Sequence, residues 1–462
     1  MAKLEKTMFR EYDIRGLVNK DELNPKSVYL INKAFAKFLS KKGIKKAIVG
    51  HDSRPSSPKF HQATIRAFVN SGFDVIDIGL SLSPIFYFSQ YYFKIKGGVM
   101  ITGSHNPPEW SGFKHAYDYS VTLLPDDVKE VYRLATNKEF IYGKGKVEKE
   151  DAFKPYLKDC QKRVNLKKEL KVVCCCNHGT AGTFAPKILK AVGCNTIDLY
   201  CNLDSTFPHG NPNPSVPELM VDCGKTVVET KADIGVGFDG DGDRLGVVDE
   251  KGNFVSIDKV EILLARHVLK EHPGAKIVFD VKCSEALPED IKAHGGIPIM
   301  WITGHSYIKA KRAEENAELA GEFSGHIFYK EHYGFDDAIY ASLKLLEYLS
   351  SQKKTVSQLL TDMPQYLSTP TLHVDCSDEV KYQVQEKLTK EFKNMGVKVI
   401  DINGARVYLD ESTWGLVRPS SNLPVLVLRF EAKTKEKLEE VQNLFHRVMD
   451  KYREISKEWR HG

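Results

Sequence analysis

Three stretches of this chain repeat one order of elements: an apolar strand, a polar loop, a helix, a glycine and a second apolar strand. The first strands of these units begin at Ala47, Val172 and Ile277. A strand followed by a helix and another strand forms a βαβ unit, in which the two strands run parallel. We therefore expect three similar α/β domains with mixed, mostly parallel sheets. Such sheets bind ligands at the carboxyl ends of their strands.

The C-terminal part of the chain follows a different pattern. Strands are predicted at residues 371–375, 397–402, 406–409 and 425–430, and helices at residues 378–395 and 435–455. Because these strands are mostly grouped rather than alternating with helices, we expect a smaller C-terminal α+β domain. Arg418 is predicted to lie in a loop, with residues 419–424, ahead of the last strand.

A chain of 462 residues is too long for a single hydrophobic core. We divide it into domain 1 (1–150), domain 2 (151–254), domain 3 (255–367) and domain 4 (368–462). Each of these domains contains one polar motif of interest. In chain order these are a serine loop, an aspartate loop, a glutamate–serine–histidine loop and an arginine loop.

Composition excludes several classes of function. Lys and Arg total 66 against 61 Asp and Glu, and the resulting net charge of +5 does not indicate nucleic-acid binding. The first six residues contain no apolar signal core, and no apolar run approaches the roughly 20 residues of a membrane helix. Nine cysteines without a disulfide-framework spacing indicate reduced, mostly buried thiols in a cytoplasmic protein.

The aspartate loop reads Gly-Phe-Asp-Gly-Asp-Gly-Asp-Arg and spans residues 237–244. In an extended segment, side chains at alternate positions point to one side, so Asp239, Asp241 and Asp243 are predicted to converge. The glycines between them allow an ion or ligand to approach the backbone. Three close carboxylates repel one another unless a cation lies among them, which predicts a site for Mg²⁺ or Ca²⁺.

The aspartate loop has two other possible interpretations, a polar hairpin turn and an EF-hand loop. A polar hairpin turn is the usual place for Asp-Gly pairs, but two pairs in series with a third Asp make it the weaker interpretation. An EF-hand loop has similar acidic spacing, yet Arg244 occupies the sixth position, where that loop needs glycine. Its flanks, residues 234–238 and 245–248, predict strands rather than helices. Three monodentate carboxylates with room for a phosphate oxygen favour Mg²⁺ over Ca²⁺.

The serine loop reads Thr-Gly-Ser-His-Asn-Pro-Pro and follows a predicted strand at residues 99–101. Ser104 therefore lies at the carboxyl end of a strand, where it is a candidate nucleophile or site of phosphoryl attachment. A turn serine without chemistry is the alternative, because serine is common between Gly and Asn-Pro. Lys114, ten residues further on, could neutralise charge at the same loop.

The remaining polar motifs are weaker when each is taken alone. Glu322 and Ser324 are spaced to face one way in an extended loop, which suits vicinal sugar hydroxyls, although an incidental polar loop fits equally well. The loop at Arg418 offers a guanidinium, hydroxyls and backbone amides, which suit a phosphate group. His305, like the polar segment around Tyr12 and Arg15, is ambiguous by itself.

The order of these motifs along the chain resembles that of the α-D-phosphohexomutase family, and within it the bacterial phosphomannomutase/phosphoglucomutase branch. The segments that carry the resemblance are residues 9–16, 102–107, 237–244, 321–326 and 418–424, with further likeness at residues 279–283 and 334–337. The resemblance implies four domains around a central cleft. It also implies reversible phosphoryl transfer between the 1- and 6-positions of a hexose phosphate (mannose, glucose or both) through a phosphoserine and a 1,6-bisphosphate.

Roles for individual residues follow from the resemblance. Ser104 would carry the phosphoryl group and, with Asp239, Asp241 and Asp243, hold Mg²⁺. The implied catalytic residues are Ser104, His326, Lys114, Arg244 and Arg15, with His326 as the leading candidate for the general base and Lys114 next. The implied substrate-binding residues are Tyr12, Lys282, His305, Glu322, Ser324, His326, Arg418, Ser420, Ser421 and Asn422. The cofactors implied are Mg²⁺ and a hexose 1,6-bisphosphate, which acts as both activator and intermediate.

The resemblance further implies that the partners are small hexose phosphates, with no nucleic acid or membrane, and that the protein is a monomer or weak homo-oligomer. Phosphoglucosamine mutase is the alternative within the family. Phe323 stands where the dual-specificity branch commonly has Met and the glucosamine branch has Gln. Two other classes remain open, a metal-dependent phosphatase that uses Ser104 and a non-catalytic sugar-phosphate sensor. A sensor would not need a phosphoryl acceptor, which argues against that class.

Overall fold

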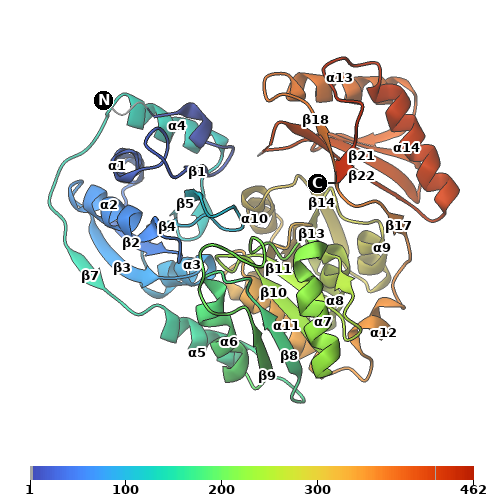
Figure 1. Cartoon of the computed structure of the whole chain (residues 1–462), viewed down its shortest axis with the longest axis horizontal. Coiled ribbons are helices and arrows are strands. Elements are labelled where there is room, and N and C mark those ends of the chain that lie inside the picture. The colour runs from blue at the N-terminus through green and yellow to red at the C-terminus, as the bar shows by residue number, and fades with distance from the viewer. Residues whose placement is uncertain (1–3, 422, 462) are drawn as a thin grey trace.

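The computed structural model describes residues 4–421 and 423–461. Four β-sheets follow one another along the chain, and no strand of one sheet pairs with a strand of another in the part that is described. Figure 1 shows the four sheets arranged along an arc, from the blue N-terminal part to the red C-terminal part. We call them the first, second, third and fourth sheets.

The first sheet has seven strands in the order β1-β5-β4-β2-β3-β7, with β6 paired to β5. This region contains β1 (Ile14–Leu17), α1 (Pro25–Lys41), β2 (Lys46–His51), α2 (Ser57–Val69), β3 (Asp74–Leu80), α3 (Ser83–Tyr92), β4 (Gly97–Ile101), β5 (Trp110–Tyr117), β6 (Val121–Thr122), α4 (Pro125–Thr136) and β7 (Val147–Lys149). Strands β4, β2, β3 and β7 run parallel, whereas β1 and β5 are antiparallel to their neighbours.

The second and third sheets are built from further βαβ units. The second region contains α5 (Phe153–Arg163), β8 (Lys171–Cys175), α6 (Ala181–Ala191), β9 (Asn195–Leu199), α7 (Val221–Thr230), β10 (Ile234–Phe238), β11 (Leu245–Val248) and β12 (Phe254–Val255). The third contains α8 (Ile257–Glu271), β13 (Lys276–Asp280), α9 (Ala286–Ala293), β14 (Ile297–Trp301), α10 (His305–Glu314), β15 (Leu319–Gly321), β16 (Ile327–Tyr329), α11 (Ala338–Ser350) and α12 (Val356–Leu360). Their orders are β12-β11-β10-β8-β9 and β14-β13-β15-β16, each with a parallel centre and antiparallel strands at one side.

The fourth sheet is antiparallel throughout the strand pairs that are described. Its region contains β17 (Leu367–Ser368), β18 (Leu372–Asp375), α13 (Lys381–Asn394), β19 (Lys398–Ile400), β20 (Ala405–Asp410), β21 (Thr413–Pro419), β22 (Val425–Ala432), α14 (Lys435–Met449) and β23 (Arg460–His461). The predicted fold class, three α/β domains and a smaller C-terminal α+β domain, is confirmed. Our proposed boundary after residue 367 falls within β17, a strand that pairs with β22.

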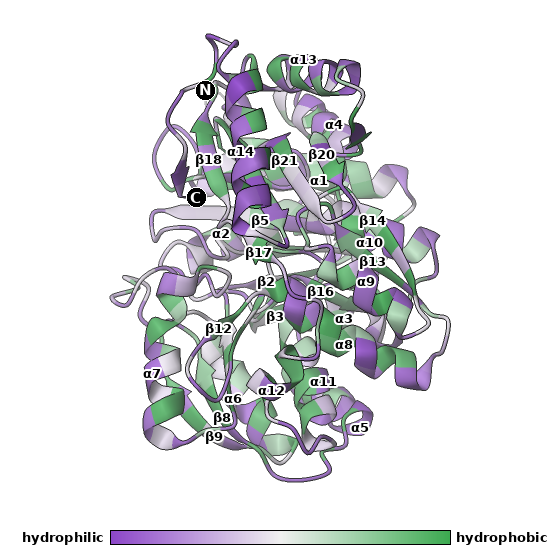
Figure 2. Ribbon diagram, turned by 90° about the vertical axis from the view of Figure 1, so that its right-hand side faces the viewer, coloured by the Kyte–Doolittle hydropathy of each residue, from purple (hydrophilic) through white to green (hydrophobic). Residues whose placement is uncertain are grey.

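Burial explains why these segments form their elements. All five residues of β4 and all five of β10 are buried, as expected for strands with helices on both faces. Helix α14 carries hydrophilic and hydrophobic residues on opposite sides, which Figure 2 shows as purple and green segments along one ribbon. One hydrophobic cluster extends from Ile48 through Val236 to Tyr340, so the first three sheets share part of their core.

The fourth region has a hydrophobic cluster of its own, which includes Val374, Leu428 and Phe445. Its polar contacts with the third region include two ion pairs, Arg406 with Glu285 at 2.6 Å and Arg429 with Asp258 at 3.1 Å. A small hydrophobic cluster that contains Val281 and Trp414 also joins the two regions. The C-terminal region therefore has its own core and is attached through both charged and apolar groups.

Two predictions about the C-terminal region were wrong in detail. The last helix was expected to reach residue 455 but ends at Met449. The chain then folds back, which buries Ile455 in the core and lets Ser456 donate its N–H to the carbonyl of Asp375. Arg418, expected in a loop, lies on β21 opposite Val427. Ladder hydrogen bonds and burial of all seven residues of β21 favour the strand.

All nine cysteines lie in the described part of the chain and are unpaired, and eight of them are buried, as predicted. None of the described helices is both long enough and apolar enough to cross a membrane.

Candidate active site

The aspartate loop joins β10 to β11, which are antiparallel neighbours with the bounds predicted from the sequence. Asp239, Asp241 and Asp243 are each 0% exposed, and one oxygen from each carboxylate lies within 4.8 Å of the other two. Gly242 has φ of 78°, a left-handed conformation that glycine adopts without strain. The three carboxylates therefore converge as predicted, but they do so on a turn between β10 and β11 rather than along the extended segment that the prediction assumed.

The serine loop follows β4 and reaches the aspartate loop directly. The hydroxyl of Ser104 donates to Oδ2 of Asp239 at 2.7 Å, and Ser104 itself is 2% exposed with φ of 49°. A left-handed serine is costly, and such strain concentrates at functional sites. A Cβ on Gly240 would lie 2.5 Å from the carbonyl oxygen of Ser104, so only glycine lets the two loops approach this closely.

Lys114 on β5 supplies positive charge to the same cluster. Its ammonium donates to Oδ2 of Asp241 at 2.7 Å and also to Oδ2 of Asp243. Burial opposes the charge of this lysine, but the carboxylates of Asp241 and Asp243 raise its pKa above the usual range. Lys114 therefore remains an ammonium among the aspartates.

The two sides of the aspartate cluster differ in their electrostatics. Burial, followed by the charges of Asp243 and Asp241, raises the pKa of Asp239 well above its usual range. Burial would raise the pKa of Asp241 as well, but Lys114 and a 2.5 Å hydrogen bond from the hydroxyl of Ser83 hold it low. The ammonium of Lys114 donates to Asp241 and Asp243 but not to Asp239, the partner of Ser104. The charge of Asp239 is therefore the least neutralised of the three.

The residues of this cluster fit a hard divalent cation. Oδ1 of Asp241 and Oδ1 of Asp243 are buried, and neither has a hydrogen-bond partner among the described residues. Burying a carboxylate oxygen without a partner is expensive unless a cation coordinates it. Three carboxylates beside a serine oxygen form an all-oxygen donor set, which suits Mg²⁺ better than softer metals.

A histidine centre lies on the third region beside the aspartate loop. Nδ1 of His326 lies 3.2 Å from Oδ2 of Asp336, and Nδ1 of His305 lies 3.4 Å from the same oxygen. Nε of Arg244 donates to Nε2 of His326 at 3.2 Å. With Nδ1 facing a carboxylate, the neutral His326 ring has its lone pair on Nε2, where it accepts the hydrogen bond from Arg244. A ligand hydroxyl would have to displace this arginine before Nε2 could act as a general base.

Asp336 is fully buried and is the common partner of this centre. Its Oδ1 also lies 3.0 Å from the ammonium of Lys309. Burial opposes its charge, but Lys309 and the two histidines hold the pKa of Asp336 well below its usual range. The group therefore stays a carboxylate that can orient both rings.

The glutamate–serine–histidine loop connects β15 to β16 and closes on itself through the N–H of Glu322, which donates to the carbonyl of His326 at 2.8 Å. Oε2 of Glu322 and the hydroxyl of Ser324 are buried without a hydrogen-bond partner in the described ranges. Burial opposes the charge of Glu322, but Lys282, and after it His326, lowers its pKa. A buried carboxylate and hydroxyl with spare capacity are suited to bind hydroxyl groups of a ligand.

The N-terminal segment contacts the serine loop and the histidine centre. Nη1 of Arg15 donates to Oδ1 of Asn106 in the serine loop at 2.9 Å. The ring of Tyr12 meets the ring of His305 edge to face, with centroids 4.9 Å apart. Of the residues predicted from the resemblance, Tyr12 thus lies beside His305 and Arg15 beside the serine loop.

Within the described part of the arginine loop, Arg418 and Ser421 contact each other. The guanidinium of Arg418 reaches the hydroxyl of Ser421 at 3.5 Å, and its Nε is buried without a hydrogen-bond partner among residues 4–421 and 423–461. The carbonyls of Ser420 and Leu423 accept from the ammonium of Lys381, at 2.5 and 2.9 Å. Asn422, also predicted to bind phosphate, lies outside the described residues.

Several groups at this site escaped the sequence analysis. Arg54 donates to the carbonyls of Ser104 and Asn106, at 2.9 and 2.6 Å, and so supports the serine loop. Arg54 follows the carboxyl end of β2, and this position was the one feature of the sequence that could have indicated a role at the site. Asp336 lies in the segment 334–337, which resembles the family but contains no local pattern that predicts contact with His305 and His326.

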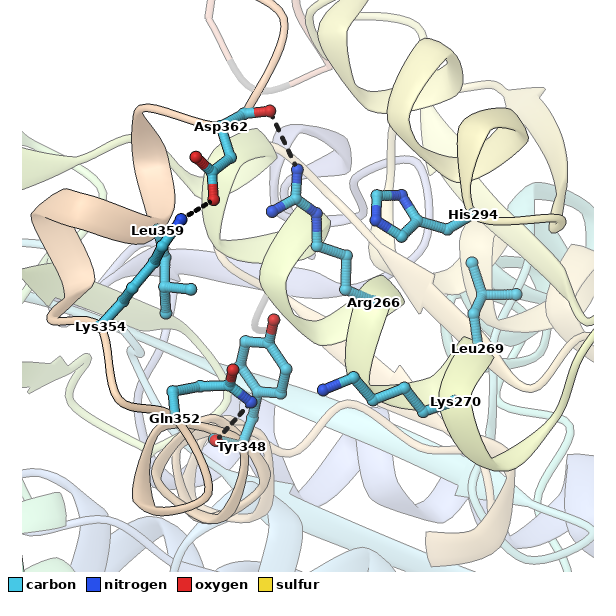
Figure 3. Close-up of a pocket in the computed structure, with 9 residues that line it drawn as sticks. All are labelled: Arg266, Leu269, Lys270, His294, Tyr348, Gln352, Lys354, Leu359 and Asp362. Atoms are coloured by element: carbon cyan, nitrogen blue, oxygen red, sulfur yellow. Dashed lines mark hydrogen bonds and ion pairs between the residues drawn. The ribbon is translucent and has the colours of Figure 1, made fainter.

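A separate pocket of about 310 Å³ lies between α8, α11 and α12. Figure 3 shows Arg266 and Lys354 reaching toward Asp362 across it. Its cations have partners, since Arg266 also donates to Asp290 at 2.8 Å and Lys354 pairs with Asp362 at 2.5 Å. The described residues that line it include none of the motif residues above.

Family models match the chain in four consecutive segments. Phosphoglucomutase/phosphomannomutase α/β/α domains I, II and III match residues 6–142, 154–252 and 256–366, and the C-terminal domain of the same family matches residues 373–448. The chain belongs to the phosphoglucomutase/phosphomannomutase family. The resemblance to this family that the sequence motifs indicated is thereby confirmed.

Curated relatives and solved structures agree with this assignment. A phosphomannomutase/phosphoglucomutase of Pseudomonas putida is 41% identical over 96% of this chain and 96% of its own length. A phosphoglucomutase of Neisseria meningitidis is 38% identical over 97% of this chain and 98% of its own. The crystal structure of a family member from Burkholderia thailandensis has a TM-score of 0.91 at 35% identity and covers 97% of this chain and 98% of that chain.

Proposed function

We propose that this protein is a phosphohexomutase that interconverts the 1- and 6-phosphates of mannose, glucose or both. The observation that carries the proposal is the 2.7 Å hydrogen bond from Ser104 to Asp239 within a buried group of three aspartates. A serine beside a cation site is suited to carry a phosphoryl group and to pass it on. The family membership supports the same reaction.

The reaction balances in two symmetrical steps. The phosphoryl group leaves the oxygen of Ser104 and bonds to the free hydroxyl of a hexose monophosphate, whose proton passes to Nε2 of His326. The Ser104 oxygen is left as an alkoxide, whose charge a cation held by the aspartates would counter. The 1,6-bisphosphate then turns over, its other phosphoryl group bonds to that oxygen, and the sugar oxygen that it leaves takes the proton back from His326. Asp336 positions His326 and stabilises the imidazolium that forms, since Oδ2 of Asp336 faces Nδ1 of His326 at 3.2 Å.

Charge on the transferring group is countered by the residues around Ser104. Asp239, Asp241 and Asp243 would hold Mg²⁺, which supplies Lewis-acid neutralisation of phosphoryl oxygens. Lys114, Arg15 and Arg244 extend this positive surface to the serine and histidine loops. Because its ammonium already donates to two aspartates, Lys114 is better suited to neutralise charge than to accept a proton.

Substrate recognition has to accept the sugar in two orientations. Oε2 of Glu322 and the hydroxyl of Ser324, which have no hydrogen-bond partner in the described part of the chain, would bind hydroxyls that both orientations present. Tyr12, Lys282 and His305 would line the same end. Arg418, with the loop that follows it, would hold the phosphate that is not reacting. In this proposal, hydroxyl binding belongs to the third region and phosphate binding to the fourth.

A coupled assay tests the proposal. We expect isomerisation of mannose 1-phosphate or glucose 1-phosphate that needs Mg²⁺ and is stimulated by a hexose 1,6-bisphosphate. Release of phosphate without isomerisation would instead identify a phosphatase, and binding without turnover a sensor. Turnover restricted to glucosamine 6-phosphate would identify a phosphoglucosamine mutase.

Replacing Asp336 by asparagine is expected to lower kcat roughly 10²- to 10⁴-fold, the range for general acid–base catalysis, with little change in KM. The amide removes the carboxylate charge that faces Nδ1 of His326 and would stabilise the imidazolium that forms. Steady-state kinetics measure kcat and KM separately. Asp290→Asn is the matched control, because Asp290 is also a buried partner of a cation, Arg266, but lies outside the site. A wild-type kcat for Asp336→Asn would contradict the positioning role.

Replacing Arg418 by alanine is expected to lower kcat/KM by roughly 2 kcal/mol, the range for a lost charge-assisted hydrogen bond, with much of the effect in KM. Arg447→Ala is the control, since that arginine is exposed on α14 of the same region. Steady-state kinetics on each active hexose phosphate measure the effect. Wild-type kinetics for Arg418→Ala on all of them would show that this loop does not bind the phosphate.

A further inference from the structure

Three thiols come together in the second region, apart from the residues assigned above. Cys174 is on β8, Cys176 follows that strand, and Cys201 follows β9. The sulfurs of Cys174 and Cys176 are 3.8 Å apart, and all three sulfurs lie within 4.8 Å of one another. Cys174 and Cys176 are fully buried, whereas Cys201 is partly exposed.

The register of two parallel strands produces this cluster. Alternate residues of a strand face the same side, so Cys174 and Cys176 point one way and Cys175 points the other. Cys175 packs accordingly in a different hydrophobic cluster, with Cys223. The N–H of Cys176 donates to the carbonyl of Leu199 at 3.2 Å, and the thiol of Cys201 donates to the carbonyl of Cys174 at 3.3 Å. The end of β9 thereby turns the third thiol onto the first two.

The sulfur separations match those of a metal–thiolate site. Zn–S bonds of about 2.3 Å place tetrahedral ligand sulfurs about 3.8 Å apart. A buried cysteine commonly acts as a small apolar residue, which accounts for Cys174 and Cys176 individually. It does not account for Cys201, which is only partly buried and yet has its sulfur within 4.8 Å of both of the other sulfurs. The thiolate is the form that binds metal.

We propose that Cys174, Cys176 and Cys201 form a three-thiolate site for a soft divalent cation of the Zn²⁺ and Cd²⁺ class. Three thiolates around a divalent ion carry one net negative charge, whereas a monovalent ion would leave two in an apolar environment. The partly exposed side of Cys201 gives access and leaves the fourth coordination position to water. Each thiol loses its proton as its sulfur binds, so loading releases protons to solvent. This site is chemically distinct from the all-oxygen site of the aspartates.

Cadmium titration of the fully reduced protein tests the proposal. Excess Mg²⁺ is kept present throughout so that it occupies hard oxygen sites. We expect a thiolate-to-cadmium charge-transfer band in the ultraviolet that grows linearly and saturates at one equivalent of Cd²⁺. Cys201→Ala should lose most of this band, and its apparent affinity should fall at least tenfold. Cys194→Ala, a buried cysteine of the same region that lies outside the cluster, should titrate like the wild type.

Folding of the variants is checked independently of the metal. Because Cys201 is partly exposed and takes no part in the proposed catalysis, Cys201→Ala should keep the circular dichroism spectrum and the mutase rate of the wild type. A wild-type protein without a saturable charge-transfer band would overturn the proposal. So would a folded Cys201→Ala variant with an unchanged band, because the third thiol would then not be a ligand.

Discussion

Alanine in place of Ser104 is expected to reduce mutase turnover at least about 10⁴-fold, because removal of a nucleophile leaves only binding and electrostatic stabilisation. The fold should be retained, since the substitution deletes one hydroxyl whose hydrogen-bond partners among the described residues, His105 and Asp239, lie in the two loops. Intact-mass analysis after incubation with a hexose 1,6-bisphosphate should show one added phosphoryl group on the wild type and none on the variant. Substrate binding, measured by calorimetry, should persist.

Ser111→Ala is the matched control for this experiment. Ser111 is 1% exposed, lies on β5 of the same sheet, and its hydroxyl has no hydrogen-bond partner among the described residues. The control should be phosphorylated and should turn over like the wild type. If the wild type remained unphosphorylated at Ser104 while isomerising substrate at full rate, the phosphoserine mechanism would be wrong.

Asparagine in place of Asp241 should lower the rate roughly 10³-fold, as expected when electrostatic stabilisation of a developing charge is lost. The amide keeps the shape of the carboxylate but removes one anionic ligand from the cation site. Chelation of the wild type with EDTA should abolish turnover, and added Mg²⁺ should restore it. The variant should need far more Mg²⁺ for its residual activity, which a titration of rate against Mg²⁺ would measure.

The free energy of unfolding of Asp241→Asn, compared with that of the wild type, separates a role of Asp241 in metal binding from a role in folding. Asp241 shares its position with two repelling carboxylates, so loss of its charge relieves repulsion while it weakens the contact with Lys114. Asp249→Asn is the control, because Asp249 is buried in the same region but only accepts hydrogen bonds from a turn. Full activity of the wild type in metal-free buffer would refute the cation site.

Local sequence patterns were sufficient for most strands. The bounds of β10 and β11 follow from two short apolar runs, whereas Asp239, Asp241 and Asp243 converge because the segment between those runs forms a turn. The parallel centres of the first three sheets follow in the same way from strand–helix–strand order. The placement of Arg418 failed, because a strand that ends in Arg-Pro-Ser-Ser resembles a loop until its partner β22 is known.

Local sequence patterns could not predict the contacts between segments that are distant in the chain. Asp239 and Ser104 are 135 positions apart, and their hydrogen bond exists because two sheets place the ends of β4 and β10 together. Asp336 contacts both His305 and His326 because the third region folds the start of α10 against the segments that flank β16. The sequence alone therefore determined, for most strands, which residues end them and what chemistry those residues carry. The tertiary structure decided which of those residues meet, because the packing of one element against another depends on the buried surfaces of both and cannot be read from either alone.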